Sequence, residues 1–230
     1  MRSHTDIGQR MKGYEDPFTT PSVDHTQPII IRVDGKAFHT YTRGMDKPFD
    51  KALMGSMDRT ALKLLELVQD AKLAYVQSDE ISLLLWNVNQ RNGQPYFGGK
   101  VQKIASVVAS MATAHFNEEM RCYTIGEAFS YPLAYFDTRV FNVPSMEEAA
   151  NYYLWRIYDW RRNFVSVVAS QHFSDKELKG KSTGERSDML QDKLLPAVID
   201  PKGDLVYTDD WKALYDDDQR YGRLFVRFGT

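Results

Sequence analysis

The fold depends on the stretch Ile29-Ile30-Ile31-Arg32-Val33-Asp34-Gly35-Lys36-Ala37-Phe38-His39. Its apolar first half is typical of a buried strand, and the Asp-Gly pair that ends it predicts that Asp34 lies at a sheet edge. Further along, apolar residues 73–76 and 81–86 flank Ser78-Asp79-Glu80, which predicts a hairpin with two acids in its tight turn. Carboxylates beside buried strands carry a desolvation cost unless something compensates them, as a divalent cation would.

The composition limits the class of protein. The chain has 230 residues, 43% of them hydrophobic, which suits one large globular domain. With 29 Lys and Arg against 31 Asp and Glu, it has no global basic field, so nucleic-acid binding would need local patches or an oligomer. The lone Cys122 excludes an intramolecular disulfide and a Cys-based metal cluster. Without an apolar signal core or membrane-length apolar run, we expect a cytoplasmic protein with no membrane association.

The first half of the chain predicts an alternation of helices and strands. A short polar helix is expected over residues 6–15, followed by a loop that contains Pro17, Pro21 and Pro28. After the first strand, apolar residues recur at helical spacing between Leu53 and Val68, and the hairpin follows. The order strand, helix, strand, turn, strand matches half of a ferredoxin-like split β-α-β unit. We therefore expect an α/β (α+β) fold.

The second half predicts further helices and one strand. A helix is expected to begin near Lys100, and residues 133–143 have a strand pattern. Ser145, with Glu148 in capping-box position, predicts a long helix that ends near Phe173. A second capping box, Ser182 with Glu185, predicts a short helix, and the rest of the chain is expected to form loops and a hairpin.

Asp34 and Asp79 are the strongest candidate metal ligands. Together with the carbonyl of Gly35 they would suffice for Mg²⁺, which takes one or two carboxylates and completes its shell with water and substrate phosphates. The alternative is that Asp34-Gly35 is only a turn and Asp79-Glu80 a solvated hairpin tip, and spacing alone leaves both open. If the strand alternates, Glu80 points away from Asp79 and could instead orient a base, a water or a basic side chain.

Phosphate-binding candidates follow the first strand and precede a later helix. Residues 35–39 could wrap a triphosphate with successive backbone N–H groups, which Lys36 would reinforce. His39 can equally be a partly buried histidine without a catalytic role. Lys100 and Lys103 lie near a predicted helix N-terminus, which favours anions, although each could be a solvated lysine.

Basic residues mixed with aromatic ones make the predicted long helix a candidate RNA-binding surface. The cations are Arg156, Arg161 and Arg162, and the aromatic residues are Tyr152, Trp155, Tyr158 and Trp160. The alternative is that the aromatic rings are core and the arginines extend past them to solvent. Lys179 and Lys181 add a basic loop, which is not a phosphate-binding P-loop because Asp175 occupies the position of the required first glycine.

Four motifs together resemble one known family. They are Arg32-Val33-Asp34-Gly35-Lys36-Ala37-Phe38-His39, Gln77-Ser78-Asp79-Glu80, Phe136-Asp137-Thr138-Arg139-Val140 and Asn151-Tyr152-Tyr153-Leu154-Trp155-Arg156. In order and spacing they are similar to the tRNA-histidine guanylyltransferase family of 3′-to-5′ nucleotide polymerases, from about Gly8 to Glu185. This family includes guanylyltransferase-like proteins of bacteria, archaea and phages.

The resemblance implies a single domain over residues 1–230, with a palm like that of polymerases and nucleotidyl cyclases. The palm core would be residues 28–145, and a helical and C-terminal hairpin part would be residues 146–230. Two Mg²⁺ would bind Asp34, the Gly35 carbonyl and Asp79, and Asp34, Asp79 and Glu80 would form the catalytic set. The triphosphate would contact Asp34, Gly35, Lys36, Ala37, Phe38, His39, Ser78 and Asp79, with Lys47, Asp50, Lys100 and Lys103 at other polar positions of nucleotide sites.

The resemblance also implies the reaction and the partners. ATP activates an RNA 5′-monophosphate, and the 3′-hydroxyl of an incoming GTP or other NTP then attacks the activated phosphate. The partner is the 5′ end and acceptor stem of a tRNA, bound by a homotetramer that is a dimer of dimers. Eukaryotic guanylyltransferases have a His-Ile-Asn-Asn motif where this chain has Arg161, which favours the guanylyltransferase-like branch and templated tRNA 5′-end repair.

Three alternatives remain open. One is addition of a single non-templated guanosine to tRNA-histidine. Another is a nucleotidyl cyclase on the same palm, although the turn at Asp79 lacks the Gly-Gly-Asp/Glu-Glu-Phe signature. The third is a non-catalytic RNA-binding module, which would have no need of metal-binding carboxylates.

Overall fold

The structure is a computed structural model that describes residues 4–87, 94–123, 131–195, 198–199, 205–206 and 210–227. The chain forms two compact units. Unit 1 comprises Met1–Arg43, Ala52–Asn151 and Leu224–Thr230, and unit 2 comprises Gly44–Lys51 and Tyr152–Arg223. Among the described residues, every helix is too short or too polar to span a membrane.

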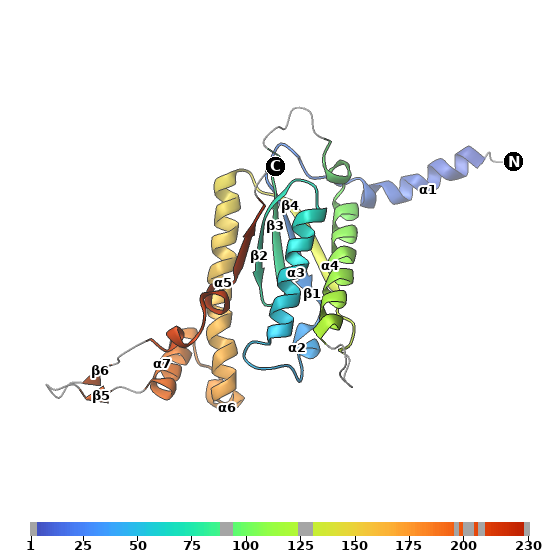
Figure 1. The fold of residues 1–230 in the computed structure, drawn as a ribbon. Coiled ribbons are helices and arrows are strands. Elements are labelled where there is room, and N and C mark those ends of the chain that lie inside the picture. Colours follow the sequence, from blue (N-terminus) through green and yellow to red (C-terminus); the bar gives the residue numbers. More distant parts are fainter. Residues whose placement is uncertain are drawn as a thin grey trace. The chain divides into compact units, whose positions relative to one another are not determined.

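A five-stranded sheet forms the centre of unit 1 (Figure 1). Its strands lie in the order β4 (Phe136–Asn142), β1 (Ile29–Gly35), β3 (Glu80–Leu85), β2 (Ala71–Gln77) and β7 (Arg223–Val226). β1 is antiparallel to both β3 and β4, and β2 is antiparallel to β3. The predicted order of strand, helix, strand, turn and strand is confirmed.

The register between β1 and β3 puts apolar residues on one face of the sheet. Val33 lies opposite Ile81, Ile31 lies opposite Leu83, and all four are fully buried. Residues directly opposite each other share a face, so the alternate residues of β1 put Arg32 and Asp34 on the other face. The charged end of that second face therefore contains Asp34, its partner Glu80 on β3, and its partner Asp137 on β4.

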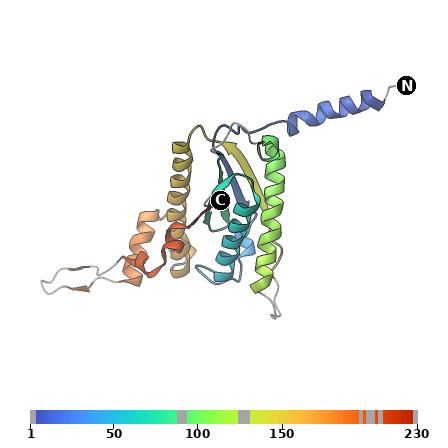
Figure 2. The same ribbon diagram turned by 45° about the horizontal axis from the view of Figure 1, so that its top comes forward.

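Two long helices pack beside the sheet of unit 1. α3 (Lys51–Leu67) and α4 (Val101–Tyr123) lie side by side, joined by an ion pair between Arg59 and Glu119 (Figures 1 and 2). Both predicted helical stripes supply buried residues, among them Met57, Ala61 and Leu64 on α3 and Ile104, Val108, Ala112 and Phe116 on α4. The short helix α2 (Phe38–Tyr41) adds Phe38, whose ring centroid is 5.6 Å from that of Phe116 and 5.3 Å from that of Phe136.

The N-terminal helix is longer than predicted. α1 spans His4–Thr19 and includes Pro17, whereas the sequence suggested a helix over 6–15 and a loop around Pro17. Pro17 lies in the last turn and has no N–H for the carbonyl of Gly13. The hydroxyls of Thr19 and Thr20 donate to the carbonyls of Glu15 and Asp16 at the end of the helix. Every residue from Asp6 to Phe18 is exposed.

Unit 2 is built on α5 (Met146–His172), whose first turns belong to unit 1, with α6 (Asp175–Leu178) and α7 (Thr183–Leu194). Its core contains Trp160, Phe164, Val168, Leu190 and Trp211. The predicted capping box of α7 is confirmed, because Ser182 and Glu185 bond each other's backbone N–H groups. At the start of α5, Ser145 Oγ accepts the N–H of Glu148 at 3.2 Å, as an N-cap residue does.

The C-terminal part contains more structure than the expected loops and hairpin. The hairpin pairs β5 (Val198–Ile199) with β6 (Leu205–Val206). The short helices η2 (Trp211–Leu214) and α8 (Asp217–Tyr221) follow, and they were not predicted. A 3-10 helix, η1 (Tyr96–Gly99), precedes α4.

We expect Leu64→Ala to lower the free energy of unfolding by about 2–5 kcal/mol, because it deletes a fully buried side chain and leaves a cavity. The matched control is Leu62→Ala on the same helix, where the side chain is 48% exposed and the change should stay within about 0.5 kcal/mol. Urea unfolding measures both values. Equal losses for the two variants would contradict the described face of α3.

Candidate active site

The structure brings Asp34-Gly35 and Asp79 together at one end of the sheet. The N–H of Gly35 donates to the carbonyl oxygen of Asp79 at 3.0 Å. A Cβ added to Gly35 would lie 2.9 Å from the Cβ of Asp79, closer than real Cβ atoms approach. The predicted juxtaposition of these two segments is therefore present, and it requires a glycine at position 35.

A two-residue turn holds Asp79. Gln77 of β2 pairs with Glu80 of β3, so Ser78 and Asp79 form the turn, with Ser78 at φ 47°. In hairpins a positive φ at this place is usually supplied by glycine, so Ser78 holds a strained conformation. The turn fixes Asp79 beside β1 instead of leaving it at a solvated tip.

Burial, together with the nearby carboxylates of Asp34 and Glu80, raises the pKa of Asp79 to about 6. Hydrogen bonds from its own N–H and from the Ser78 hydroxyl act in the opposite direction and favour the charged form. Three carboxylates thus interact at one place where solvent screening is poor. A cation placed among them would relieve this repulsion.

Glu80 lies on the sheet face of Asp34, opposite it across the β1–β3 pair. The expectation that strand alternation turns Glu80 away from Asp79 does not apply, because Asp79 is in the turn and outside the strand. The Glu80 side chain is buried, and its carboxylate accepts from Gln77 Nε2 at 3.1 Å and from Ser82 Oγ at 3.3 Å. These contacts suit a residue that positions the turn.

The donor set fits Mg²⁺ better than metals that need several side-chain ligands. Among the described residues, no group of three or more His, Cys, Asp and Glu side chains is arranged to hold a metal. Two carboxylates and the Gly35 carbonyl are nevertheless enough for Mg²⁺, which keeps waters and binds substrate phosphates.

The predicted phosphate-binding loop offers fewer backbone N–H groups than expected. The N–H of Gly35 is bonded to Asp79, and that of Lys36 donates to the Tyr135 carbonyl at 2.8 Å. Ala37 has a left-handed conformation and precedes α2, where the N–H groups of Thr40 and Tyr41 donate to its carbonyl. The N–H groups of Phe38 and His39 are therefore the candidates for an anion. The Phe38 ring is buried in the core, while the side chains of Lys36 and His39 are exposed.

Lys100 and Lys103 are not brought to this site. α4 begins at the other end of the sheet, where Lys100 forms a bridge with Ser22. Beside Gly35, the N–H of Phe136 donates to Thr113 Oγ1, and ten residues of helix from Lys103 to Thr113 span about 15 Å. The sequence located the helix N-terminus correctly but could not give the direction of the helix along the sheet.

Lys47 and Asp50, which were expected at polar positions of nucleotide sites, belong to unit 2. Lys47 is exposed, and the Asp50 carboxylate accepts the N–H of Asp46 at 3.1 Å. This hydrogen bond closes the loop that leads into α3.

The RNA candidates divide into buried and exposed residues. Arg156 is buried, 3.2 Å from Asp159 and 4.6 Å from the Trp155 ring centre, so its role is within unit 2. Arg161, Arg162 and Lys179 are exposed. Lys181, also exposed, pairs with Glu185 at 3.3 Å. The aromatic residues divide similarly, with Tyr152 and Trp160 buried and Trp155 and Tyr158 exposed.

Sequence reasoning gave no role to Asp137, which lies directly opposite Asp34 and is exposed. The sequence did contain a signal for Asp137, because strand alternation in residues 136–142 puts Asp137 and Arg139 on one face. It also gave no role to Lys212, Arg220 and Tyr221, which line a cavity in unit 2.

Comparison with known proteins identifies the family. Residues 8–144 match the family model described as tRNAHis guanylyltransferase. The chain belongs to the tRNA-histidine guanylyltransferase family. The shared fold is the expected palm-like sheet packed with helices.

Two solved structures and one sequence illustrate the similarity. A bacterial tRNA(His) guanylyltransferase (Thg1)-like protein in complex with ATP has a TM-score of 0.83 and 38% identity, over 96% of this chain and 88% of that chain. A structure with the same description in complex with GTP has a TM-score of 0.67 and 45% identity, over 73% of this chain and 77% of that chain. A probable tRNA(His) guanylyltransferase of Dictyostelium discoideum is 31% identical over 70% of this chain and 66% of its own length.

The chain spans less than two thirds of the length of the first curated relatives that it matches: 65% of a mimivirus protein, 56% of the mouse protein and 66% of the Dictyostelium protein.

We expect Gly35→Ala to lower the free energy of unfolding by about 1–3 kcal/mol, since the new methyl group would meet Phe38 ring carbons and Asp79 Cβ. The control is Gly184→Ala on α7, where the nearest atom is 3.9 Å away and the change should be neutral or stabilising. Thermal unfolding compares the two. A neutral Gly35→Ala would contradict the close approach of β1 to the turn.

Proposed function

We propose that this protein is a nucleotidyltransferase that adds nucleotides to a tRNA 5′ end in the 3′-to-5′ direction, activating the end with ATP. The observation that carries the proposal is the approach of Asp34 and Gly35 to Asp79 within a palm-like sheet. The bacterial relatives in complex with ATP and GTP support nucleotides as the substrates.

Asp34, the Gly35 carbonyl and Asp79 would hold Mg²⁺. Bound there, Mg²⁺ would neutralise charge on the transferring phosphoryl group and would lower the pKa of the attacking hydroxyl. Lys36 and the N–H groups at the start of α2 would bind and orient the triphosphate. Glu80 would keep the turn in place through its contacts with Gln77 and Ser82.

We assign the protein to the templated, 5′-end-repair branch. Arg161 replaces the histidine of the His-Ile-Asn-Asn motif of eukaryotic guanylyltransferases. The identity to the two bacterial guanylyltransferase-like structures, 38% and 45%, exceeds the 31% identity to the Dictyostelium guanylyltransferase. Both observations favour selection of the NTP by pairing with the opposite strand.

We expect Asp34→Asn and Asp79→Asn to reduce nucleotide addition by about 100-fold or more, because each removes a charge that would hold the metal. The substrate is a labelled tRNA lacking its first nucleotide, supplied with ATP, Mg²⁺ and one NTP at a time. Asp188→Asn, an exposed carboxylate on α7, is the control and should retain full activity.

The products decide between the alternatives. Addition of only the NTP complementary to the opposing base supports templated repair. Guanosine added regardless of that base would instead indicate a tRNA-histidine guanylyltransferase, and a cyclic product from GTP alone would indicate a cyclase. RNA binding without any addition by the unaltered protein would indicate a binding module.

We further propose that the protein is a homo-oligomer in which α1 pairs with α1 of a second copy. Four large apolar residues recur on this exposed helix at spacings of four, three and four: Ile7, Met11, Tyr14 and Phe18. An isolated helix of 16 residues is marginal in water, so an exposed apolar stripe favours a partner for α1.

The second copy fits because α1 is self-complementary. In an antiparallel pair with its two-fold axis between Lys12 and Gly13, Ile7 lies opposite Phe18 and Met11 opposite Tyr14. In the same arrangement Arg10 lies opposite Glu15. A two-fold axis needs such a self-complementary patch, and this pairing would supply one interface of the expected dimer of dimers.

We expect Arg10→Glu to weaken self-association, because it places two acids opposite each other across the pair. The double change Arg10→Glu with Glu15→Arg should restore association, since the charges again face their opposites. Sedimentation equilibrium measures the mass, with Leu62→Ser as a control that alters an exposed leucine of α3. A mass that is the same for all variants, or a double variant as weak as the single one, would refute this pairing.

A further inference from the structure

A basic cavity of about 530 Å³ lies within unit 2, among α5, α7, η2 and α8. Its lining contains four cationic side chains and no Asp or Glu: Arg161, Arg162, Lys212 and Arg220. The volume falls in the range of ordinary ligand sites. This charge pattern favours an anionic ligand.

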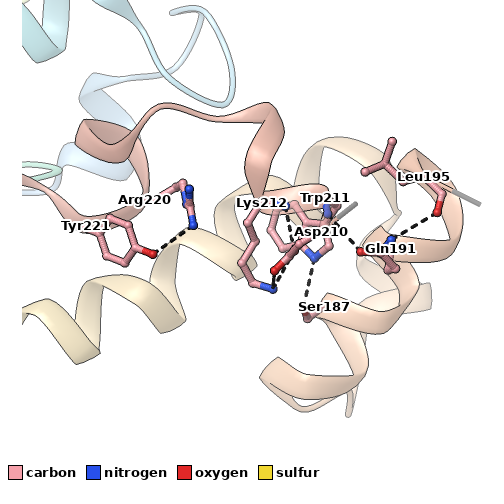
Figure 3. A network of polar contacts seen from close by, with 8 residues as sticks. All are labelled: Ser187, Gln191, Leu195, Asp210, Trp211, Lys212, Arg220 and Tyr221. Carbon is pink, nitrogen blue, oxygen red and sulfur yellow. Dashed lines mark hydrogen bonds and ion pairs between the residues drawn. The ribbon is translucent and has the colours of Figure 1, made fainter. Parts of the chain in front are cut away.

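Carboxylates outside the lining pair with three of these cations. Asp210 Oδ1 and Oδ2 lie 3.1 and 3.2 Å from Lys212 Nζ (Figure 3). Arg162 is 2.7 Å from Asp159, and Arg220 is 3.4 Å from Asp217. These pairs are partly exposed to solvent and therefore weak, so an anion in the cavity can compete with the carboxylates for the cations.

Trp211 anchors η2 against α7. Its Nε1–H donates to Ser187 Oγ at 3.1 Å, and its backbone N–H donates to Gln191 Oε1 at 3.0 Å (Figure 3). Its ring stacks on Phe164, with centroids 5.5 Å apart. Because Trp211 is fully buried, the wall that carries Lys212 is part of the core of unit 2.

The start of α7 forms another part of the cavity wall. Thr183 and Gly184 are its first two residues, and both line the cavity. The first N–H groups of a helix have no acceptor within it and attract anions. The Ser182 cap accepts from Glu185, and the nearest atom to a Cβ at Gly184 is 3.9 Å away, so the backbone there is open.

Two tyrosines give the cavity stacking surfaces. Tyr158 is 58% exposed and Tyr221 is 36% exposed. The guanidinium carbons of Arg220 and Arg161 lie 5.0 and 5.6 Å from the Tyr221 ring centre, and Arg220 Nη2 donates to the Tyr221 hydroxyl at 3.0 Å (Figure 3). Aromatic rings and arginine planes are the groups on which unpaired RNA bases stack.

We propose that this cavity binds one phosphate and the adjoining unpaired base of the RNA substrate. The proposal rests on the proposed function, which makes an RNA the substrate. The four cations of the lining favour an anionic group such as an RNA phosphate, and the two tyrosines favour an unpaired base beside it. The lining also lacks a carboxylate for the Mg²⁺ that accompanies a free nucleoside triphosphate.

The test is equilibrium binding of a fluorescent tRNA that lacks its first nucleotide, in EDTA and without NTPs, so that no chemistry occurs. We expect Arg161→Gln combined with Arg220→Gln to raise the Kd about tenfold or more, because hydrogen bonds to charged groups are lost. The slope of log Kd against log salt should fall by about 1 for the phosphate contact. Tyr221→Ala should also weaken binding, while Tyr221→Phe, which keeps the ring, should bind nearly as the unaltered protein does.

The matched control is Arg59→Gln. Arg59 also pairs with a carboxylate, that of Glu119, and lies 5.0 Å from the ring centre of Tyr123, but it is outside the cavity. Its replacement should leave the Kd unchanged. Melting temperatures of all variants check that they are folded.

Three results would overturn the proposal: unchanged RNA affinity of the double variant, an equal loss for Arg59→Gln, or a GTP affinity that falls while RNA affinity does not. The last result would make the cavity a free-nucleotide site. If the double variant binds RNA normally in a protein that extends tRNA, only the cavity assignment fails. If the unaltered protein binds no RNA, the proposed function fails with it.

Discussion

The register between β1 and β3 decides where the carboxylates of this protein lie. Asp34 pairs with Glu80, and this pairing puts Gly35 against the turn that holds Asp79. A slip of one residue would move Asp34 to the apolar face and Val33 to the charged one. Such a slip is opposed by the packing of Ile31, Val33 and Ile81, all fully buried, so the apolar core fixes the geometry of the candidate site.

The candidate site destabilises the folded state, whereas the apolar core stabilises it. Burial and two neighbouring carboxylates raise the pKa of Asp79, and Ser78 takes a positive φ that a side chain disfavours. Groups held at such a cost are characteristic of binding and catalytic sites, where local stability is lost for function. The free energy that offsets them comes from the sheet face and helices α3 and α4.

Features with a local signal in the sequence were predicted well. The hairpin around Asp79, the apolar stripes of α3 and α4 and the capping box at Ser182 follow from spacings of a few residues. The proximity of Asp34 and Asp79 also followed, because each is placed by the end of a strand. The alternation of β1 and β4 could have revealed Asp137, but only once their register was known.

Features that depend on direction in space or on distant segments were not predicted. Lys103 was grouped with the phosphate-binding residues because the sequence around it does not indicate that α4 starts at the far end of the sheet. The basic cavity joins residues from α5, α7, η2 and α8, and no periodicity connects Arg161 with Arg220. The length of α1 was underestimated because Pro17 was expected to lie in a loop, whereas the helix continues through it to Thr19.

The last strand of the sheet has a consequence for how the chain folds. β7 lies beside β2, and the N–H of Arg227 donates to the carbonyl of Lys72 at 2.9 Å. The sheet is therefore completed only after the chain has passed through Tyr152–Arg223, the larger segment of unit 2. Pairing β7 with β2 closes a loop that contains this entire segment, and the entropic cost of closure is smaller when that loop is already compact. During synthesis the palm therefore has an open edge at β2 until unit 2 has emerged and condensed.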